Sequence, residues 1–311
     1  MEKNMKRSKE KKSKKKIWLW IVASLLTIFL VLIGSAYFTI QKTMNKINTP
    51  LLQTTEATQQ EAKTVIRKDP FSVLLLGVDE RKEDSGRSDT MIVVTVNPEK
   101  QTMKMLSIPR DTRTEIVGHD TVDKINHAYA FGGVPMAVDT VEHFLNIPID
   151  YYVFINMEGF LQIIDTLGGV TIDNDMDLTY NEYHYPKGEV TLDGNEALIF
   201  SRIRYEDPRG DFGRQIRQRQ IIEAVMKKAS TPSTLLKATD MLDVLGDNVR
   251  MNFSVKDLLQ LQSLYKKMNA DIEQLSFEAG EGERIRGIWY YIPDDKELQR
   301  IQLTLNNHLK K

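Results

Sequence analysis

Residues 71–77 read Phe-Ser-Val-Leu-Leu-Leu-Gly, a short apolar run that ends in a glycine. A run of this length, bounded by a turn residue, predicts a buried β-strand. Two more apolar segments, 90–96 and 103–108, flank a turn centred on Pro98 and predict an antiparallel hairpin. These three strands decide that the fold contains a sheet, and they place its beginning near residue 70.

Strand-like and helix-like segments are mixed along the rest of the chain without strict βαβ repetition. Residues 174–190 look irregular, and Gly168–Gly169 ends the helix before them. The mixture predicts an α/β fold, a single α/β/α domain with a mixed central sheet that spans residues 70–311. The further strands expected are 151–155, 170–173, 272–277 and 284–292; the helices expected are 123–131, 134–146, 157–167, 193–200, 213–229, 233–245, 254–268 and 294–309.

Residues 17–40 contain no charged side chain and are long enough, as a helix, to cross a bilayer core of about 30 Å. Residues 1–16 before them carry nine Lys and Arg but only two Glu, which predicts a cytoplasmic tail and an extracellular domain. A cleaved signal peptide is the alternative, with small residues at 34–36, but the apolar run is longer than usual for one. The polar segment 41–69 is predicted to be an extracellular stalk. The expected protein is a single-pass membrane protein with its N-terminus inside.

The composition excludes several classes of protein. The chain has no cysteine, so disulfides, thiolate catalysis and cysteine-bound zinc are ruled out. Five scattered histidines show no ligand spacing. Because the basic residues are concentrated in the tail, the remainder of the chain is acidic overall, and no binding to nucleic acid is expected.

Six of the sixteen arginines lie within residues 201–219, a stretch without lysine. Guanidinium groups bind carboxylate and phosphate oxygens in a bidentate way, so this bias predicts an anion site. In the helix 213–229, Arg214, Arg217 and Gln218 share one face, and the same stripe continues into apolar residues. Cations are disfavoured in the first turns of a helix, which favours a bound anion there.

An alternative explanation of the same arginines is a set of internal ion pairs with Glu206, Asp207 and Asp211. Arg209 and Arg219 are expected to be ordinary surface residues.

Two aspartates flank the turn between the first strands: Asp79 follows one strand and Asp89 precedes the next. Two carboxylates at such a turn could hold a divalent cation such as Mg²⁺ or Mn²⁺, which would keep waters and share phosphate oxygens. The alternative is that aspartates are simply common in turns. Arg110 and Asp111 follow the strand 103–108, and Arg110 could point to the same end of the sheet.

Acidic residues able to bind a metal, together with convergent arginines, are typical of phosphoryl transfer. The chain lacks a Gly-x-x-x-x-Gly-Lys-Ser/Thr loop and a Gly-x-Ser-x-Gly elbow, which excludes a P-loop enzyme and disfavours esterase chemistry.

The order of these motifs resembles the LytR-CpsA-Psr family of Gram-positive cell-envelope proteins, and most closely its teichoic acid ligases. The resemblance covers the whole chain and follows an N-terminal anchor with five blocks: Leu-Leu-Leu-Gly-Val-Asp79, Arg87-Ser-Asp89-Thr, Ser-Ile-Pro-Arg110-Asp111-Thr, Phe-Ser-Arg202-Ile-Arg204-Tyr and Asp211-Phe-Gly-Arg214-Gln-Ile-Arg217-Gln218.

The resemblance implies a phosphotransferase that takes an anionic polymer, such as wall teichoic acid, from an undecaprenyl-pyrophosphate carrier. It joins the polymer to the C6 hydroxyl of muramic acid in peptidoglycan, next to the membrane lipid. The family also encloses the polyprenyl chain in an apolar tunnel. By this resemblance Asp79 and Asp89 bind Mg²⁺, and the pyrophosphate is bound by Arg110, Arg202, Arg204, Arg214, Arg217 and Gln218. The expected catalytic residues are Asp89, Arg110 and Asp111, and the general base is left open between Asp89 and Asp111.

Three other functions stay open from the sequence. The chain could be a membrane-bound regulator of cell-wall gene expression, a scaffold that holds lipid-linked polymer, or a lipid pyrophosphatase in which water replaces the sugar hydroxyl.

Overall fold

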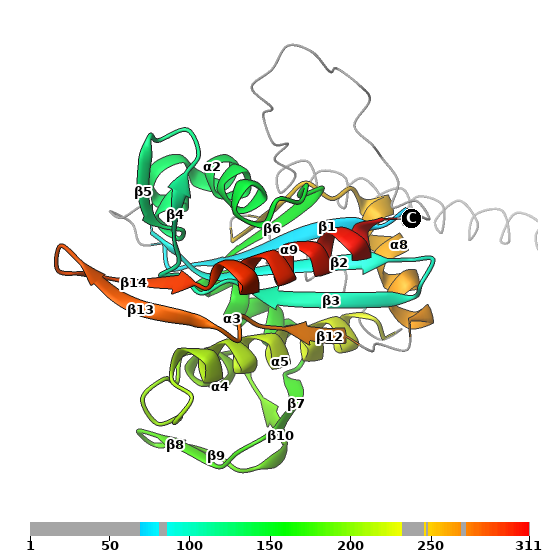
Figure 1. Ribbon diagram of the computed structural model, residues 1–311. Coiled ribbons are helices and arrows are strands. Elements are labelled where there is room, and N and C mark those ends of the chain that lie inside the picture. Colours follow the sequence, from blue (N-terminus) through cyan, green and yellow to red (C-terminus); the bar gives the residue numbers. More distant parts are fainter. Residues whose placement is uncertain (1–68, 81–85, 232–245, 247, 269–271, 311) are drawn as a thin grey trace, which may run out of the picture. The chain divides into compact units, whose positions relative to one another are not determined.

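The computed structural model describes residues 69–80, 86–231, 246, 248–268 and 272–310, all of which belong to the second of two units, residues 44–311 (Figure 1). The predicted tail, the predicted membrane helix 17–40, nearly all of the stalk and the helix expected at 233–245 lie outside these residues. Among the described residues, none of the helices combines the length and the apolar character needed to span a membrane.

A mixed sheet forms the centre of this unit, as predicted, and it has six strands. Strand β1 is paired antiparallel with β2 and parallel with β6, and the β2–β3 pair is the expected hairpin. The strand order is β11-β6-β1-β2-β3-β12, where β1 is Phe71–Val78, β2 Ser88–Asn97, β3 Thr102–Ser107, β6 Tyr151–Asn156, β11 Val249–Met251 and β12 Ile272–Leu275.

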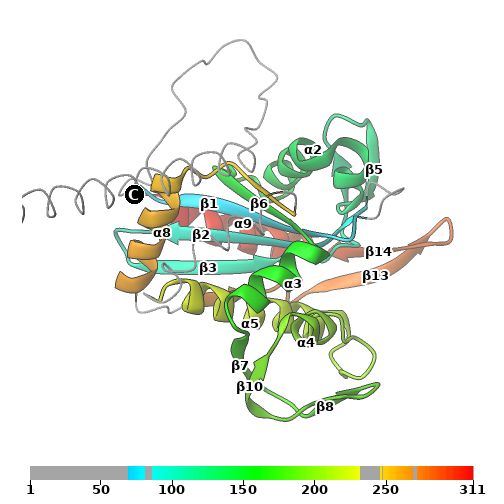
Figure 2. The same ribbon diagram turned by 180° about the vertical axis from the view of Figure 1, so that it is seen from behind.

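Helices cover both faces of the sheet, which explains why β1 is apolar at almost every position. Leu74 and Leu76 of β1 pack on one face with α2 (His127–Leu145) and α9 (Asp295–Leu309). Val73 and Leu75 pack on the other face, which is covered by α3 (Met157–Thr166), α5 (Asp211–Ala229) and α8 (Val255–Lys267). The two layers of helices are seen from opposite sides in Figures 1 and 2, and they confirm the α/β/α arrangement.

Residues 174–190 were predicted to be irregular, and this was wrong. They contain β8 (Leu178–Tyr180), β9 (Tyr183–Tyr185) and the beginning of β10 (Gly188–Leu192), which pairs with β7 (Val170–Asn174). These strands and α4 (Gly194–Phe200) bury a third apolar cluster against α3 and α5. The strands are too short for a sequence pattern to reveal them.

Two further predictions need correction. The helix expected at 123–131 begins only at His127, because Thr121–Lys124 forms strand β5 of a hairpin with β4 (Arg113–Ile116). The strand expected at 284–292 is a second hairpin, β13 (Gly280–Ile285) and β14 (Ile288–Pro293), because Arg286 and Gly287 both have positive φ and form its turn.

Side chains at the helix N-termini fix where several helices begin. Asn156 caps α3, and capping boxes open α4 at Asp193 and α8 at Ser254. Helix α5 differs, because it follows Gly210, which has φ 57° and no side chain to cap the first turn.

Candidate active site

The C-terminal ends of β1, β3, β6 and β12 meet at one edge of the sheet. These strands run in the same direction, since β1 and β3 are both antiparallel to β2 and each has a parallel neighbour. The loops that leave this C-terminal edge after β1 and β3 carry the motifs of Asp79, Asp89, Arg110 and Asp111, as in other open α/β sheets.

A β-bulge places Asp89 at this edge. Gly77 pairs with Thr90, but the next residue, Val78, pairs with Ser88, so Asp89 is the extra residue of the ladder. Asp79 comes directly after Val78, the last residue of β1, and its backbone nitrogen lies 3.4 Å from the carbonyl oxygen of Arg87. The register therefore brings the two predicted metal-binding aspartates to the same end of the β1–β2 pair.

Arg110 leaves β3 and turns toward the bulge. Its Nη1 donates to Asp89 Oδ1 at 2.9 Å. Burial disfavours its charge, but the charge and the hydrogen bond of Asp89, together with the charges of Asp111 and Asp211, outweigh that effect and raise the pKa of Arg110. Its Nε is buried, 3.8 Å from Asp111 Oδ2, and donates no hydrogen bond to any described residue. The Arg110 side chain is 25% exposed, so a ligand can still reach this guanidinium group.

Asp111 is held by a residue that the sequence analysis did not include in the site. Lys124 Nζ donates to Asp111 Oδ1 at 2.7 Å. Lys124 ends β5, which had been predicted as a helix, so its position could not be expected. The pair ties the β4–β5 hairpin to the C-terminal edge.

Arg214 comes to the same place from the first turn of α5, and its residue is only 8% exposed. Its Nη2 lies 2.7 Å from Asp211 Oδ1, while its buried Nε has no hydrogen-bond partner among the described residues. Burial lowers the pKa of Arg214; Asp211 opposes this effect, and the positive charges of Arg110 and Arg204 add to it. A buried cation beside other cations, at the positive end of a helix, is stabilised by a bound anion.

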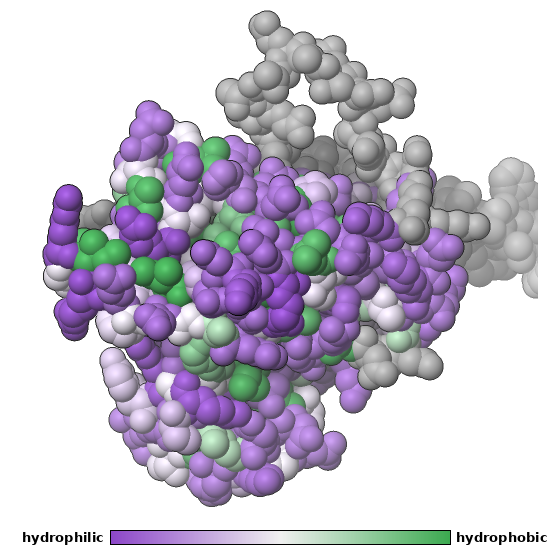
Figure 3. Space-filling model, in the orientation of Figure 1, coloured by the Kyte–Doolittle hydropathy of each residue, from purple (hydrophilic) through white to green (hydrophobic). Residues whose placement is uncertain are grey.

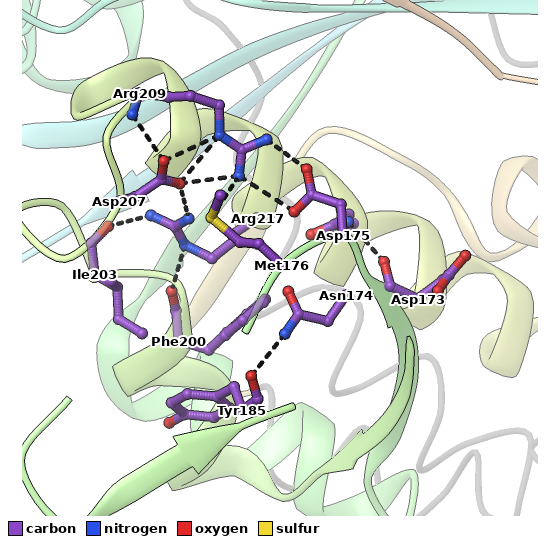
Figure 4. Close-up of polar contacts among 11 residues, drawn as sticks. Asp173, Asn174, Asp175, Met176, Tyr185, Phe200, Ile203, Asp207, Arg209 and Arg217 are labelled. Atoms are coloured by element: carbon purple, nitrogen blue, oxygen red, sulfur yellow. Dashed lines mark hydrogen bonds and ion pairs between the residues drawn. The ribbon is translucent and has the colours of Figure 1, made fainter. Parts of the chain in front are cut away.

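Arg217 belongs to a separate, internal network (Figure 4). The residue is fully buried, and its Nη1 forms an ion pair with Asp207, which is 2% exposed. Its Nε donates to the carbonyl oxygen of Phe200 at 3.2 Å, and its Nη2 donates to that of Ile203. Every nitrogen of this guanidinium group is therefore used within the protein.

Asp207 also binds Arg209, through the backbone N–H at 2.8 Å and through Nε at 3.0 Å. Burial alone would raise the pKa of Asp207, but the hydrogen bonds from Arg209 and Arg217 lower it to about 2. The Arg209 side chain continues to Asp175, as Figure 4 shows. These contacts correspond to the alternative of internal ion pairs for Arg217 and Arg209, and a role of Arg217 as a pyrophosphate ligand stays a prediction.

Gly213 allows this network to lie against α5. A Cβ atom added there would be 1.9 Å from Asp207 Oδ2, far inside van der Waals contact. The Asp211-Phe-Gly-Arg214 motif therefore combines Gly213, which is needed for close packing, with Arg214, which belongs to the candidate site.

The other predicted ligands lie around the same edge. Arg204 stacks over the ring of Tyr205 at 5.4 Å and is close enough to Arg214 to lower its pKa. Arg202 is exposed and contacts Met157 at the start of α3. Gln218 lies 3.5 Å from the carbonyl oxygen of Ser201 and supports the segment that carries both arginines.

Arg219 was expected at the surface, and this was wrong. The residue is 6% exposed, and its Nη1 donates to Ser107 Oγ at 2.7 Å. Burial lowers its pKa to about 10. The reason is that α5 is covered on two sides: Ile221 and Ala224 face the third cluster, while the stripe of Arg219 packs on the sheet. A single helical stripe cannot indicate a second buried one.

A divalent cation at Asp79 and Asp89 stays a prediction. Mg²⁺ commonly takes one or two carboxylates, waters and substrate phosphates rather than a full cage of protein ligands. The described part of the chain contains no group of three or more His, Cys, Asp or Glu residues arranged to bind a metal ion.

Known proteins share these features. The LytR_cpsA_psr family profile matches residues 34–307. The chain belongs to this family. A relative from Halalkalibacterium halodurans, the polyisoprenyl-teichoic acid–peptidoglycan teichoic acid transferase TagU, is 48% identical over 302 residues, which cover 95% of this chain and 99% of that protein.

Solved structures of the family agree with the fold. The crystal structure of Bacillus subtilis TagU is 45% identical and superposes with a TM-score of 0.65, covering 78% of this chain and 98% of that one. The structure of TagT bound to LIIa-WTA is 35% identical, with a TM-score of 0.67, and covers 78% of this chain and 91% of that one. The resemblance noted in the sequence is thereby confirmed.

Proposed function

We propose that this member of the LytR_cpsA_psr family is a phosphotransferase of the cell envelope. It transfers an anionic wall polymer, such as wall teichoic acid, from an undecaprenyl-pyrophosphate carrier to the muramic acid C6 hydroxyl of peptidoglycan. The name of the Halalkalibacterium relative and the ligand of TagT support this substrate class. The predicted anchor at 17–40 would hold the domain outside the cell, against the leaflet that presents the carrier.

One observation carries the proposal. Arg110 and Arg214 come from different elements to the C-terminal edge, each with a buried Nε that donates to no described residue. Burying two such donors costs free energy unless a ligand accepts their hydrogen bonds. A pyrophosphate diester offers several acceptor oxygens and two negative charges, which suits this pair.

The roles of the other residues follow from their positions. Asp79 and Asp89 would hold Mg²⁺, or Mn²⁺ in its place, which neutralises phosphate charge when it is bound. Asp89 pairs with Arg110, and this pair would hold the arginine beside the phosphate that reacts. Arg204 and Arg202 extend the positive rim toward α3.

In the reaction, the acceptor hydroxyl forms a bond to the phosphorus atom of the polymer, and the bond to the carrier phosphate breaks. Charge accumulates on the bridging oxygen, where guanidinium donors lower the barrier. Asp111 is paired with Lys124 and Asp89 with Arg110, so neither carboxylate is free of a cation in this structure. The assignment of the general base between them stays open.

The test is polymer transfer by the full chain from a lipid-pyrophosphate donor to peptidoglycan. We expect Asp89→Asn to lower the rate about 100-fold or more, as the loss of a group that stabilises the transition state does in other enzymes. Asp177→Asn, an exposed position on the β7–β10 side, is the matched control. Transfer by Asp89→Asn at the unchanged rate would refute the proposal, and release of free polymer without attachment would indicate a pyrophosphatase instead.

A further inference from the structure

A row of aromatic rings leads from the β13–β14 hairpin to the candidate site. Side chains alternate along β14: Tyr290 is buried and donates to Asp123 of β5, whereas Trp289 and Tyr291 lie on the opposite face. The hairpin extends beyond the edge of the six-stranded sheet in Figures 1 and 2. Two aromatic residues thus follow each other at a spacing of about 7 Å on one face of a projecting hairpin.

Glycines on the partner strand make room for both rings. A Cβ atom at Gly282 would lie 2.0 Å from the Trp289 ring, and one at Gly280 would lie 2.4 Å from the hydroxyl oxygen of Tyr291. Each ring therefore lies across the backbone of β13, which holds it in place. Such packing stabilises a two-stranded hairpin, but it leaves the outer ring face open.

The row continues into the candidate site. Phe212 of α5 meets Tyr291 edge to face, with the ring centres 6.3 Å apart. Phe212 and Arg214 both lie in the first turn of α5, on different faces of the helix. On the other side, the N–H of Tyr291 donates to the carbonyl oxygen of Asp111 at 2.9 Å. The inner end of the row, Tyr291 with Phe212, therefore lies between the segment of Asp111 and the first turn of α5.

Two of the rings are open to solvent, which is unusual for residues of their size. Trp289 is 46% exposed and Phe212 is 42% exposed. Apolar residues reach the surface over this hairpin in Figure 3. The hairpin carries Glu281 and Glu283 as well as two arginines, Arg284 and Arg286, so its charges balance. A hairpin without net charge does not attract nucleic acid or an anionic membrane electrostatically.

We propose that Trp289, Tyr291 and Phe212 form a platform that binds the acceptor as an uncharged glycan strand. The proposal rests on the proposed function, which requires a sugar hydroxyl to reach Arg110 and Arg214. Sugar rings have flat apolar faces and polar edges, and exposed Trp and Tyr rings suit such amphipathic partners. The platform aligns successive sugars along the hairpin, and the strand ends at the phosphate site.

Binding can be measured directly, because the chain has three tryptophans and two of them, Trp18 and Trp20, precede the domain. In the full chain in detergent with Trp18→Phe and Trp20→Phe, Trp289 is the only tryptophan. We expect its emission to change in a saturable way with an N-acetylglucosamine tetramer, and Phe212→Ala to weaken this binding roughly three- to tenfold. Leu303→Ala, which removes an exposed apolar side chain of α9, should have no effect.

Two results would overturn the platform: no response to the tetramer, or a response to phosphatidylglycerol vesicles alone, which would make the hairpin a membrane contact. Kinetics provide a second readout. Trp289→Ala should raise the KM for acceptor glycan several-fold. It should lower the rate of donor hydrolysis in water much less. If no transfer occurs with any variant, the proposed function fails, whereas the fluorescence titration still decides whether the platform binds glycan.

Discussion

Replacing Asp207 by Asn tests whether the internal arginine network is structural. The substitution keeps the shape of the side chain but removes the charge that faces Arg217, which is fully buried. Removing one partner of a buried ion pair typically costs about 3–5 kcal/mol, because the other charge is left uncompensated. The depressed pKa of Asp207, about 2 against an ordinary 3.8, agrees with a strong stabilisation of the carboxylate.

The magnitude can be checked by urea unfolding of the wild type and the variant. We expect the Asp207→Asn protein to lose at least about 3 kcal/mol. Asp175→Asn is the control, since this carboxylate also pairs with Arg209 but its side chain is 44% exposed, and its loss should cost at most about 1 kcal/mol.

Equal stabilities of the two variants would contradict this reasoning.

The network also predicts that the protein loses stability in acid. Because the pKa of Asp207 in the folded protein is below its value in the unfolded chain, its contribution to the free energy of unfolding is present above pH 4 and is lost as the pH falls toward 2.

Two further substitutions test the packing of the same unit. Gly213→Ala should destabilise the protein by about 1–3 kcal/mol, since the new methyl group would overlap Asp207, and thermal unfolding measures this loss. His308 is buried between the hydroxyls of Thr95 and Thr102, and burial, with the charges of Lys104 and Lys100, lowers its pKa to about 4. The unfolded chain binds the proton at a higher pH, so stability should fall by up to about 3 kcal/mol as the pH drops from 6.5 to 4. A His308→Gln protein should lack this slope, and a slope that persists in it would contradict the assignment.

The central strands could be predicted from the sequence because burial on both faces imposes a simple pattern. The apolar run of β1 and the Pro98 turn were sufficient for β1, β2 and β3. Short strands such as β5 and β8 were missed because three or four residues carry too little periodicity, and their burial depends on distant partners.

The same distinction applies to the site. Helical periodicity predicted that Arg217 and Arg214 point inward. It could not show that Asp207 neutralises Arg217 while Arg214 faces the C-terminal edge. The bulge at Asp89 leaves no trace in the local sequence, since it is defined by the register with β1. Lys124 reached the site only because β4 and β5 form a hairpin.

The most direct test of the central claim is the binding of a short polyprenyl pyrophosphate, geranylgeranyl pyrophosphate, to the full chain by calorimetry with and without Mg²⁺. We predict that Arg214→Ala weakens binding about tenfold or more, as expected for the loss of a charge-assisted hydrogen bond, and that removing Mg²⁺ weakens it as well. The control is Arg284→Ala on the β13–β14 hairpin, which should bind like the wild type. Unchanged affinity in Arg214→Ala would show that the pyrophosphate does not bind at the C-terminal edge.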